Sequence, residues 1–338
     1  MKKQKYILII LMIIMTMFNV SAVSVSATAD ESDTVILGGE PFGIKMFAEG
    51  VMVIKTENVK GSLSTGCPAE EAGIKANDII ISANGKKLNS NEELSKIIES
   101  SQGNTITMNI KRNDEIFTAQ LTPSKNAQGI YKAGMWVKDS AAGIGTVTFY
   151  SEELGGFCGL GHGICESSTG ILIPISYGEI EGAYIASVTK SCDSNVGTLN
   201  GYFTREHIGT AVQNNNHGIY GKTESQITGK EIKIADDEDV KTGDAQIYTT
   251  VYGQEPELYD AKILKVNTIS SDADIVIKIT DDELLEKTGG IVQGMSGSPI
   301  IQDGMLVGAV THVIVDDVDC GYGIFAERML ETLRESCN

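Results

Sequence analysis

The sequence predicts a mostly β protein with two domains. Glycine accounts for 37 of the 338 residues and proline for only 6, a balance that favours many tight turns between short strands. Beyond residue 130, β-branched runs are separated by Gly, Asn or Asp turns. Such closely spaced strands without alternating helices predict an antiparallel barrel or sandwich. A chain of this length fits two domains at about 150 residues each.

The charge balance excludes some classes of partner. There are 45 acidic and 27 basic residues, so the formal net charge is −18. Nucleic acids and anionic membrane surfaces require clustered cations, and we therefore expect neither to bind. The hydrophobic share of 41% and the charged share of 21% are typical of a folded globular protein.

Residues 1–27 predict export. Three lysines within the first five residues precede an apolar run from Tyr6 to Phe18, and small residues follow up to Ala27, which is the pattern of a signal peptide. The apolar run is shorter than the ~20 residues needed to span a bilayer. The uncharged stretch continues to Ala27, however, so a cleaved signal and a retained membrane anchor both remain open. Either way, we expect an extracytoplasmic protein.

Residues 30–123 predict a small α+β domain. Gly50–Ile54 is an apolar strand, and Asp78–Gly85 is a strand that runs into an Asn-Gly turn. Asn89 or Ser90 is expected to cap a helix with Leu94, Ile97 and Ile98 on one face. A half-buried hairpin is expected at residues 105–111 and 116–121.

The turn at Pro41-Phe42-Gly43-Ile44 is a candidate peptide-binding loop. Placed before a strand, it can present successive backbone N–H groups to a peptide carboxylate, while the strand and the Leu94 helix form a groove for an added β-strand. A plain turn is the alternative.

Residues 130–338 predict the larger, strand-rich domain. The expected strands are 143–150, 170–175, 245–252, 261–266, 274–280, 299–301 and 305–315, and the two expected helices are 282–287 and 326–335.

The segment Gly294-Met295-Ser296-Gly297-Ser298 is a candidate nucleophile turn. A serine flanked by glycines before a strand projects its hydroxyl and leaves backbone N–H groups bare, as a nucleophile with an oxyanion hole requires. The donors would be the N–H groups of Gly294 and Ser296. A Gly-Ser loop without catalytic function remains the alternative.

A serine hydroxyl needs a base, for which neutral imidazole is the usual group. Among the four histidines, His162 lies in a glycine-flanked turn suited to aiming a side chain into a cleft, and ranks first. His312, in an apolar strand, ranks second. His207 and His217 lie in a polar stretch and are expected to be solvated.

The group that would orient the imidazole is less clear from the residues alone. Asp281 lies 15 residues before Ser296, but it also fits a helix-capping box at 280–283. Asp139, Asp244 and Asp260 are the competitors.

The six cysteines predict neither a disulfide framework nor a metal site. They are scattered over a long chain, so one or two bridges or mostly free thiols are expected. Cys158, His162 and Cys165 have a spacing that occurs in zinc sites, but no second Cys/His pair lies nearby, and no cysteine has a base in a recognisable frame.

Several segments together resemble a known family. Ala72-Gly73-Ile74-Lys75-Ala76-Asn77-Asp78-Ile79-Ile80 resembles bacterial PDZ domains, with Phe42-Gly43-Ile44 in place of their carboxylate-binding loop. Leu160-Gly161-His162, the segment 289–300 around Gly-Met-Ser-Gly-Ser-Pro, and Gly308–Val313 are similar to the stage IV sporulation protein B peptidases.

The resemblance implies a serine endopeptidase with a chymotrypsin-like double β-barrel and no metal or organic cofactor. Ser296, His162 and Asp281 take the positions of the family's triad. It also implies secretion into the space between the forespore membranes, cleavage of itself and of the regulator of an intramembrane protease, and binding of peptide tails by the PDZ domain.

The sequence departs from the usual pattern at three points. In chymotrypsin-like enzymes the triad aspartate lies far nearer the histidine in sequence than Asp281 lies to His162. Chymotrypsin-like enzymes usually carry Asp before the serine, where this chain has Met295, so their internal ion pair is absent. The Cys158/Cys165 pair beside His162 is an addition that suggests redox sensitivity. A non-catalytic PDZ scaffold with a degenerate peptidase domain is the alternative function, against which intact Ser296 and His162 count.

Overall fold

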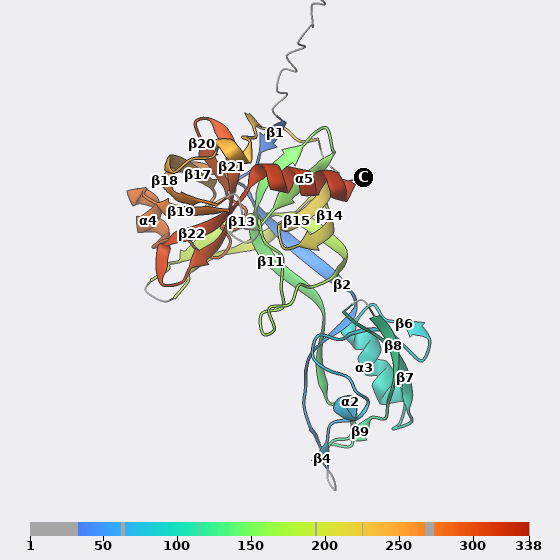
Figure 1. Cartoon of the computed structure of the whole chain (residues 1–338). Helices are drawn as coiled ribbons and strands as arrows, with labels where there is room; N and C mark the ends of the chain where they lie inside the picture. The colour runs from blue at the N-terminus through green and yellow to red at the C-terminus, as the bar shows by residue number, and fades with distance from the viewer. Residues whose placement is uncertain are drawn as a thin grey trace, which may run out of the picture. The chain divides into compact units, whose positions relative to one another are not determined.

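The computed structural model describes residues 33–61, 65–113, 115–192, 195–224, 226–267 and 274–337. Strands dominate this part of the chain, which confirms the mostly β class (Figure 1). The expected export segment, residues 1–27, lies outside the described residues. Among those described, no helix is long and apolar enough to cross a membrane.

Six strands pair in a ring to form the first barrel. Each pairs with the next in antiparallel fashion, and the ring closes where the last strand meets the first. In ring order they are β2 (Pro41–Thr56), β11 (Met135–Ser151), β12 (Gly156–Gly159), β15 (Gly218–Thr223), β14 (Thr198–Asn215) and β13 (Ile175–Thr189). Beside β11 the sheet is extended by β1 (Thr34–Leu37) and β16 (Glu231–Lys233).

A second set of six strands forms the second barrel, which closes on itself. In ring order they are β17 (Gly243–Thr249), β18 (Glu257–Val266), β19 (Ile275–Ile279), β22 (Asp317–Phe325), β21 (Met305–Ile314) and β20 (Pro299–Gln302). The short helix α4 (Asp282–Thr288) follows β19. The two rings confirm the expected double β-barrel.

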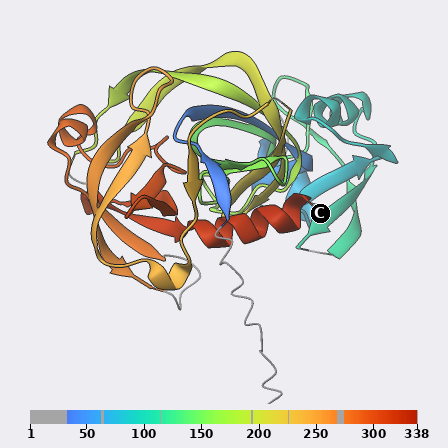
Figure 2. The same ribbon diagram turned by 90° about the horizontal axis from the view of Figure 1, so that it is seen from above.

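The C-terminal helix α5 (Ala326–Cys337) packs against both barrels (Figure 2). Its buried face, with Met329, Leu330 and Leu333, shares one apolar cluster with Phe149 of the first barrel and Leu306 of the second. Burial of this amphipathic stripe therefore ties the two barrels together.

The small domain has its own core. It contains the second half of β2, with β5 (Ile79–Ala83), β7 (Ile106–Arg112) and β8 (Glu115–Leu121) paired in turn, and the helices α2 (Pro68–Glu71) and α3 (Asn91–Ser100). The short strands are β3 (Val59–Lys60), β4 (Thr65–Gly66), β6 (Lys86–Lys87), β9 (Ser124–Lys125) and β10 (Tyr131–Lys132).

For this domain, the predicted helix cap is confirmed and the predicted peptide-binding loop is not. The Ser90 hydroxyl caps α3 by accepting a hydrogen bond from the N–H of Glu93, as one of the two alternatives had it. The peptide-binding role of Phe42, Gly43 and Ile44 needs correction. These residues lie in the first half of β2, paired with β11 and β13 of the first barrel.

Packing in the first barrel explains the correction. Phe42 and Ile44 are buried in the core of that barrel, and a Cβ atom on Gly43 would lie 2.4 Å from the ring of Phe203. The backbone N–H groups of this segment are therefore used in strand pairing and are not free for a carboxylate. Residues 34–48 pair within the first barrel, although the sequence grouped them with residues 30–123.

Candidate active site

Ser296 lies on a tight turn that connects α4 to β20. Gly294 and Gly297 have φ values of 103° and 95°, which only glycine adopts readily. A Cβ atom on Gly297 would lie 2.0 Å from the carbonyl oxygen of Thr146. Between them, Met295 is fully buried in the core of the second barrel. Burial of this methionine anchors the turn at the position where chymotrypsin-like enzymes have an ion pair.

Strand β11 of the first barrel holds the serine turn from the other side. The Thr146 hydroxyl donates to the carbonyl oxygen of Gly294 at 2.8 Å, and the Thr146 N–H donates to that of Ser296 at 3.0 Å. The Thr148 hydroxyl donates to the carbonyl oxygen of Gly297 at 2.8 Å. The turn is thus fixed by both barrels.

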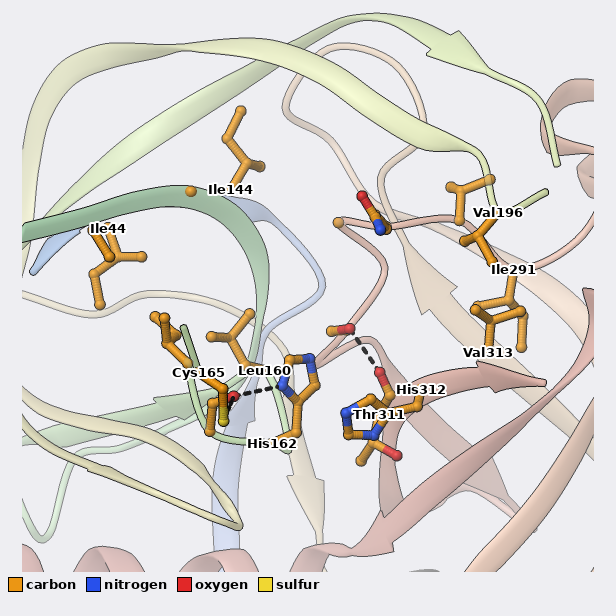
Figure 3. A pocket seen from close by; sticks show the side chains of 18 of the residues that line it. Ile44, Ile144, Leu160, His162, Cys165, Val196, Ile291, Thr311, His312 and Val313 are labelled. Atoms are coloured by element: carbon orange, nitrogen blue, oxygen red, sulfur yellow. Dashed lines mark hydrogen bonds between the residues drawn. The ribbon is translucent and has the colours of Figure 1, made fainter. Parts of the chain in front are cut away.

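The hydroxyl of Ser296 opens into a cavity of about 510 Å³ that His162 and His312 also line. In this structure the hydroxyl donates to the carbonyl oxygen of Thr311 at 2.7 Å (Figure 3). Hydrogen bonds between catalytic groups are often loose or absent without substrate. The arrangement therefore corresponds to a resting hydroxyl within the same cavity as an imidazole.

The expected oxyanion donors have the required freedom. Among hydrogen bonds between described residues, none is donated by the N–H of Gly294 or of Ser296, whereas the N–H groups of Met295 and Gly297 donate to Val292 and Val310. Two uncommitted backbone donors, one on the serine itself and one two residues before it, can bind a developing oxyanion.

The turn that carries His162 also has backbone angles that few residues adopt. Leu160 and Gly161 have φ values of 67° and 65°, and the turn follows β12 directly. The Nδ1 atom of His162 lies 3.0 Å from the carbonyl oxygen of Gly163. A carbonyl can only accept, so this bond assigns the proton to Nδ1 and leaves Nε2 as the acceptor that a general base needs.

The surroundings of His162 keep its imidazole neutral. Burial, and to a lesser degree the nearby His312, lower its pKa from 6.5 to about 4. The two rings lie 4.3 Å apart between centroids, tilted by 34°. At neutral pH His162 is therefore ready to accept a proton.

The structure does not bring Asp281 to His162. One carboxylate oxygen of Asp281 accepts from the N–H of Leu284 at 2.9 Å, and the other from the N–H of Asp260 at 3.2 Å. Asp281 is thus the N-cap of α4, one residue later than the predicted capping box. Its role as the orienting acid is corrected, because both oxygens are engaged at a helix terminus and neither lines the cavity.

Two of the competing acids are engaged elsewhere, and the third, Asp244, does not line the cavity. Asp139 accepts from the N–H of Asn91 at the start of α3, and Asp260 pairs with Gln246. Within the described ranges, no carboxylate forms a hydrogen bond or ion pair with His162. The carbonyl oxygen of Gly163 is the acceptor that holds the ring.

His217 lies nearer to the site than the sequence suggested. It lines a second cavity, of about 230 Å³, together with His162, His312 and the buried Asp274. Asp274 is paired with Arg328 at 2.8 Å. The polar, Asn-rich sequence around His217 gave no signal of this position, since only the pairing of β14 with β15 places it there.

The two cysteines beside His162 point into different environments. Cys158 is buried in the apolar cluster under α5, and Cys165 is exposed at the rim of both cavities. All six cysteines are free thiols. Among the described residues no group of three or more His, Cys, Asp or Glu side chains is arranged to hold a metal ion.

The small domain offers a groove beside α3. The groove is lined by Leu94 and Ile98 of the helix and by Met135 and Val137 at the start of β11, around a cavity of about 100 Å³. Residues 135–138 of β11 pair with β2. The strand that faces the helix thus comes from residues 135–137 and not from Phe42-Gly43-Ile44.

Known proteins match this chain in separate parts. Two curated proteins named as zinc metalloproteases, from Neisseria meningitidis and Clostridium perfringens, are 35% and 28% identical over 74 and 79 residues. These matches cover 22% and 23% of this chain, and 17% and 24% of those proteins. The chain therefore spans a quarter or less of their length.

Solved structures match at low overall similarity. The PDZ domain of the SdrC-like protein Lmo2051 from Listeria monocytogenes covers 26% of this chain and 87% of its own, with 25% identity and a TM-score of 0.22. The active form of the Rv3671c protease from M. tuberculosis covers 58% and 74%, with 15% identity and a TM-score of 0.34. The fold assignment therefore rests on the strand pairing described above.

Two family models match the chain. The model of the PDZ domain matches residues 30–122, which include most of the small domain and the α3 side of its groove, whereas the other wall of the groove, residues 131–137, lies beyond the match. The model of the SpoIVB peptidase S55 family matches residues 129–330, more than half of the chain, and includes both barrels' candidate catalytic turns. The chain therefore carries a segment that matches a PDZ domain, and it belongs to the SpoIVB peptidase S55 family.

Proposed function

We propose that this chain is a serine endopeptidase and that it acts in sporulation as an exported signalling enzyme. It cleaves itself and then the regulator of an intramembrane protease, in the space between the forespore membranes. Family membership supports the sporulation role, and the lysines and apolar run within residues 1–27 support export. Whether residues 1–27 remain as an anchor decides how close the enzyme stays to a membrane-bound target.

The observation that carries the catalytic assignment is the shared cavity. Ser296 and His162, from different barrels and separated by 134 positions in the sequence, line one space of about 510 Å³. Two turns with left-handed backbone angles are maintained only where surrounding contacts enforce them, and here both turns aim their polar side chains into that space.

The mechanism is acyl transfer. Ser296 releases its hydrogen bond to Thr311 and attacks a peptide carbonyl, while Nε2 of His162 takes the hydroxyl proton and returns it to the leaving amine. The N–H groups of Gly294 and Ser296 bind the oxyanion. The carbonyl oxygen of Gly163 holds the imidazole in the required tautomer, the function that Asp281 was expected to perform.

Self-processing tests the proposal. The full-length chain and its Ser296→Ala variant are expressed in parallel, and both are followed by intact mass over hours. We expect the wild type to shorten near its N-terminus and the variant to stay whole. Equal fragmentation of both would show that Ser296 is not the nucleophile, and the absence of fragments in both would favour the scaffold alternative.

The PDZ groove is proposed to bind peptide tails of protein partners, by adding a strand beside residues 135–137. A Ser95→Trp substitution fills the groove from the exposed face of α3, and Lys96→Trp, on the same helix but outside the groove, is the matched control. We expect only Ser95→Trp to abolish binding of fluorescent peptides with apolar C-terminal residues. Equal binding by both variants would contradict this groove.

A further inference from the structure

The cavity around Ser296 has two apolar lobes that lie on opposite sides of the reactive hydroxyl. Figure 3 shows Val196, Ile291 and Val313 gathered on one side of the hydrogen bond from Ser296 to Thr311. Ile44, Ile144 and Leu160 lie on the other side, and Leu160 is beside His162. We call the first set the acyl lobe and the second set the amine lobe.

The positions of the oxyanion donors and of the base determine which part of a substrate each lobe receives. The carbonyl under attack must direct its oxygen to the N–H groups of Gly294 and Ser296, so the residue that supplies this carbonyl lies toward the segment 291–296. His162 must protonate the departing amine, so the residue after the scissile bond lies on the imidazole side. The acyl lobe therefore faces the side chain that precedes the cleaved bond.

The walls of the acyl lobe are fixed by backbone hydrogen bonds. The N–H of Ile291 donates to Val318 at 2.7 Å, and the N–H of Gln293 donates to Gly197 at 2.9 Å. Ile291 is only 2% exposed, and Val313 packs against the core of the second barrel. A pocket with such walls is formed before substrate binds and can discriminate between side chains.

No charged side chain, among the described residues, lines this cavity. The chain as a whole has a net charge of −18, yet none of the acidic side chains that the structure describes lines the cavity, where it could pair with a basic side chain of a substrate. An ionised side chain would enter the acyl lobe without a counter-charge, which is strongly unfavourable. Transfer of an apolar side chain from water into the lobe has a favourable free energy.

We propose that Val196, Ile291 and Val313 form the primary specificity pocket, and that the enzyme cleaves after apolar residues. The inference rests on the proposed nucleophile and names the substrate class of that same site. Its determinants come from two segments far apart in sequence, the β13–β14 connection and the end of β21, together with the serine loop.

Covalent labelling of the full-length chain tests the proposal. The probes are peptide diphenyl phosphonates that differ only in the residue carrying phosphorus, with a Leu, Val, Arg or Glu side chain. The serine oxygen forms a bond to phosphorus, its proton passes to the base, and phenol leaves. Rates are read from intact mass. We expect the Leu and Val probes to react at least about tenfold faster than the others, as differences within apolar pockets commonly reach 10- to 200-fold.

A pair of valine substitutions locates the pocket. Val313→Asp places a carboxylate in the acyl lobe, so the Leu probe should slow at least about tenfold and the Arg probe should become the faster of the two. Val212→Asp makes the same change at a valine that is 43% exposed on β14, outside the cavity, and should leave the order of rates unchanged. Val196→Asp provides a second variant with the same expectation, should Val313→Asp fail to fold.

The outcomes separate this inference from the catalytic assignment. Equal rates for all four probes, lost in Ser296→Ala, would overturn the apolar specificity and keep the nucleophile. An unchanged order of rates in both lobe variants would overturn the assignment of the pocket. Labelling that persists in Ser296→Ala, or labelling of the wild type by none of the probes, would contradict the nucleophile and the inference together.

Discussion

Residues of both barrels line the cavity, but the two barrels are built differently. The second barrel closes on itself, and its serine turn is anchored in its core by Met295. The first barrel carries the His162 turn, but two of its strands, β2 and β11, continue into the PDZ domain. β11 also holds the serine turn through Thr146 and Thr148. Ser296 is thus held in place by a strand whose other end lines the PDZ groove.

The contact between β11 and the serine turn should be the place most sensitive to substitution. Gly297→Ala would put its Cβ 2.0 Å from the carbonyl oxygen of Thr146 and 2.5 Å from the nitrogen of Leu160, both backbone atoms. We expect activity to fall below detection and the free energy of unfolding to drop by about 2–4 kcal/mol. Urea denaturation and peptide hydrolysis measure both.

A glycine away from this contact is the matched control. Gly304 has a φ of 80°, and nothing lies within 4 Å of a Cβ built there. Gly304→Ala should therefore cost only about 1–2 kcal/mol from the left-handed backbone and leave activity intact. Similar losses of activity in both variants would show that the tight approach between barrels is not what matters.

His162 should give the next largest effect. His162→Ala removes the proposed general base and should lower kcat/KM by about a thousandfold or more. His207→Ala should change kcat/KM little, because His207 is exposed, with its Nε2 atom 3.2 Å from a carboxylate oxygen of Glu224, and lies outside the cavity. Comparable activity in His162→Ala and wild type would contradict the assignment.

The pH dependence sharpens the same assignment. With a folded pKa of about 4, His162 stays neutral, and kcat/KM should retain its plateau down to about pH 5 and decline near pH 4. The unfolded chain protonates near 6.5, so the stability contribution of this residue is present above pH 6.5 and is lost as the pH falls toward 4. An acid limb at 6.5 would show that the buried neutral state is not the active one.

Thr146→Val should have a smaller effect. It removes the hydroxyl that bonds the Gly294 carbonyl and keeps the side-chain shape, so the turn that carries the oxyanion donors is less well held. We expect kcat to fall about 10- to 100-fold with little change in KM. Thr223→Val, which removes a hydroxyl bonded to the Gly155 carbonyl elsewhere in the first barrel, is the control. Equal kcat values for the two variants would remove Thr146 from the positioning of the turn.

Asp281→Asn should have the smallest effect on catalysis. An orienting acid of a triad contributes about 10⁴ in kcat, whereas the cap of α4 contributes about 0.5–2 kcal/mol to stability. We expect kcat within about twofold of wild type, because asparagine also caps helices, and Asp281→Ala to lower the melting temperature only. A loss of several orders of magnitude in kcat would restore Asp281 as the acid that orients His162.

The features that could be predicted from the sequence share one property: each depends on residues that are close together in the sequence. Glycines on both sides of Ser296 and His162 predict strained turns that expose a side chain, since few other residues adopt those backbone angles. The alternation of short strands predicts β structure because burial on one face has a period of two. The helix around Leu94 and its cap at Ser90 follow from the same kind of local pattern.

The predictions that needed correction depended on partners far away in the chain. Phe42-Gly43-Ile44 has the composition of a PDZ loop, but pairing with β11 and β13, more than 90 positions later, buries it in a barrel. Asp281 has the sequence context of the family's acid, but hydrogen bonds with Leu284 and Asp260 engage its carboxylate.

The sequence alone therefore determined the fold class, and it predicted Ser296 and His162 as candidate nucleophile and base, because these features depend on backbone angles and side-chain chemistry within a few residues. Only the tertiary structure decided which groups surround them. The hydrogen bond from Thr146 to the serine turn and the apolar acyl lobe both require segments that lie far apart in the sequence to meet. Such long-range contacts depend on strand register and core packing over the whole chain, which cannot be predicted from a local sequence pattern.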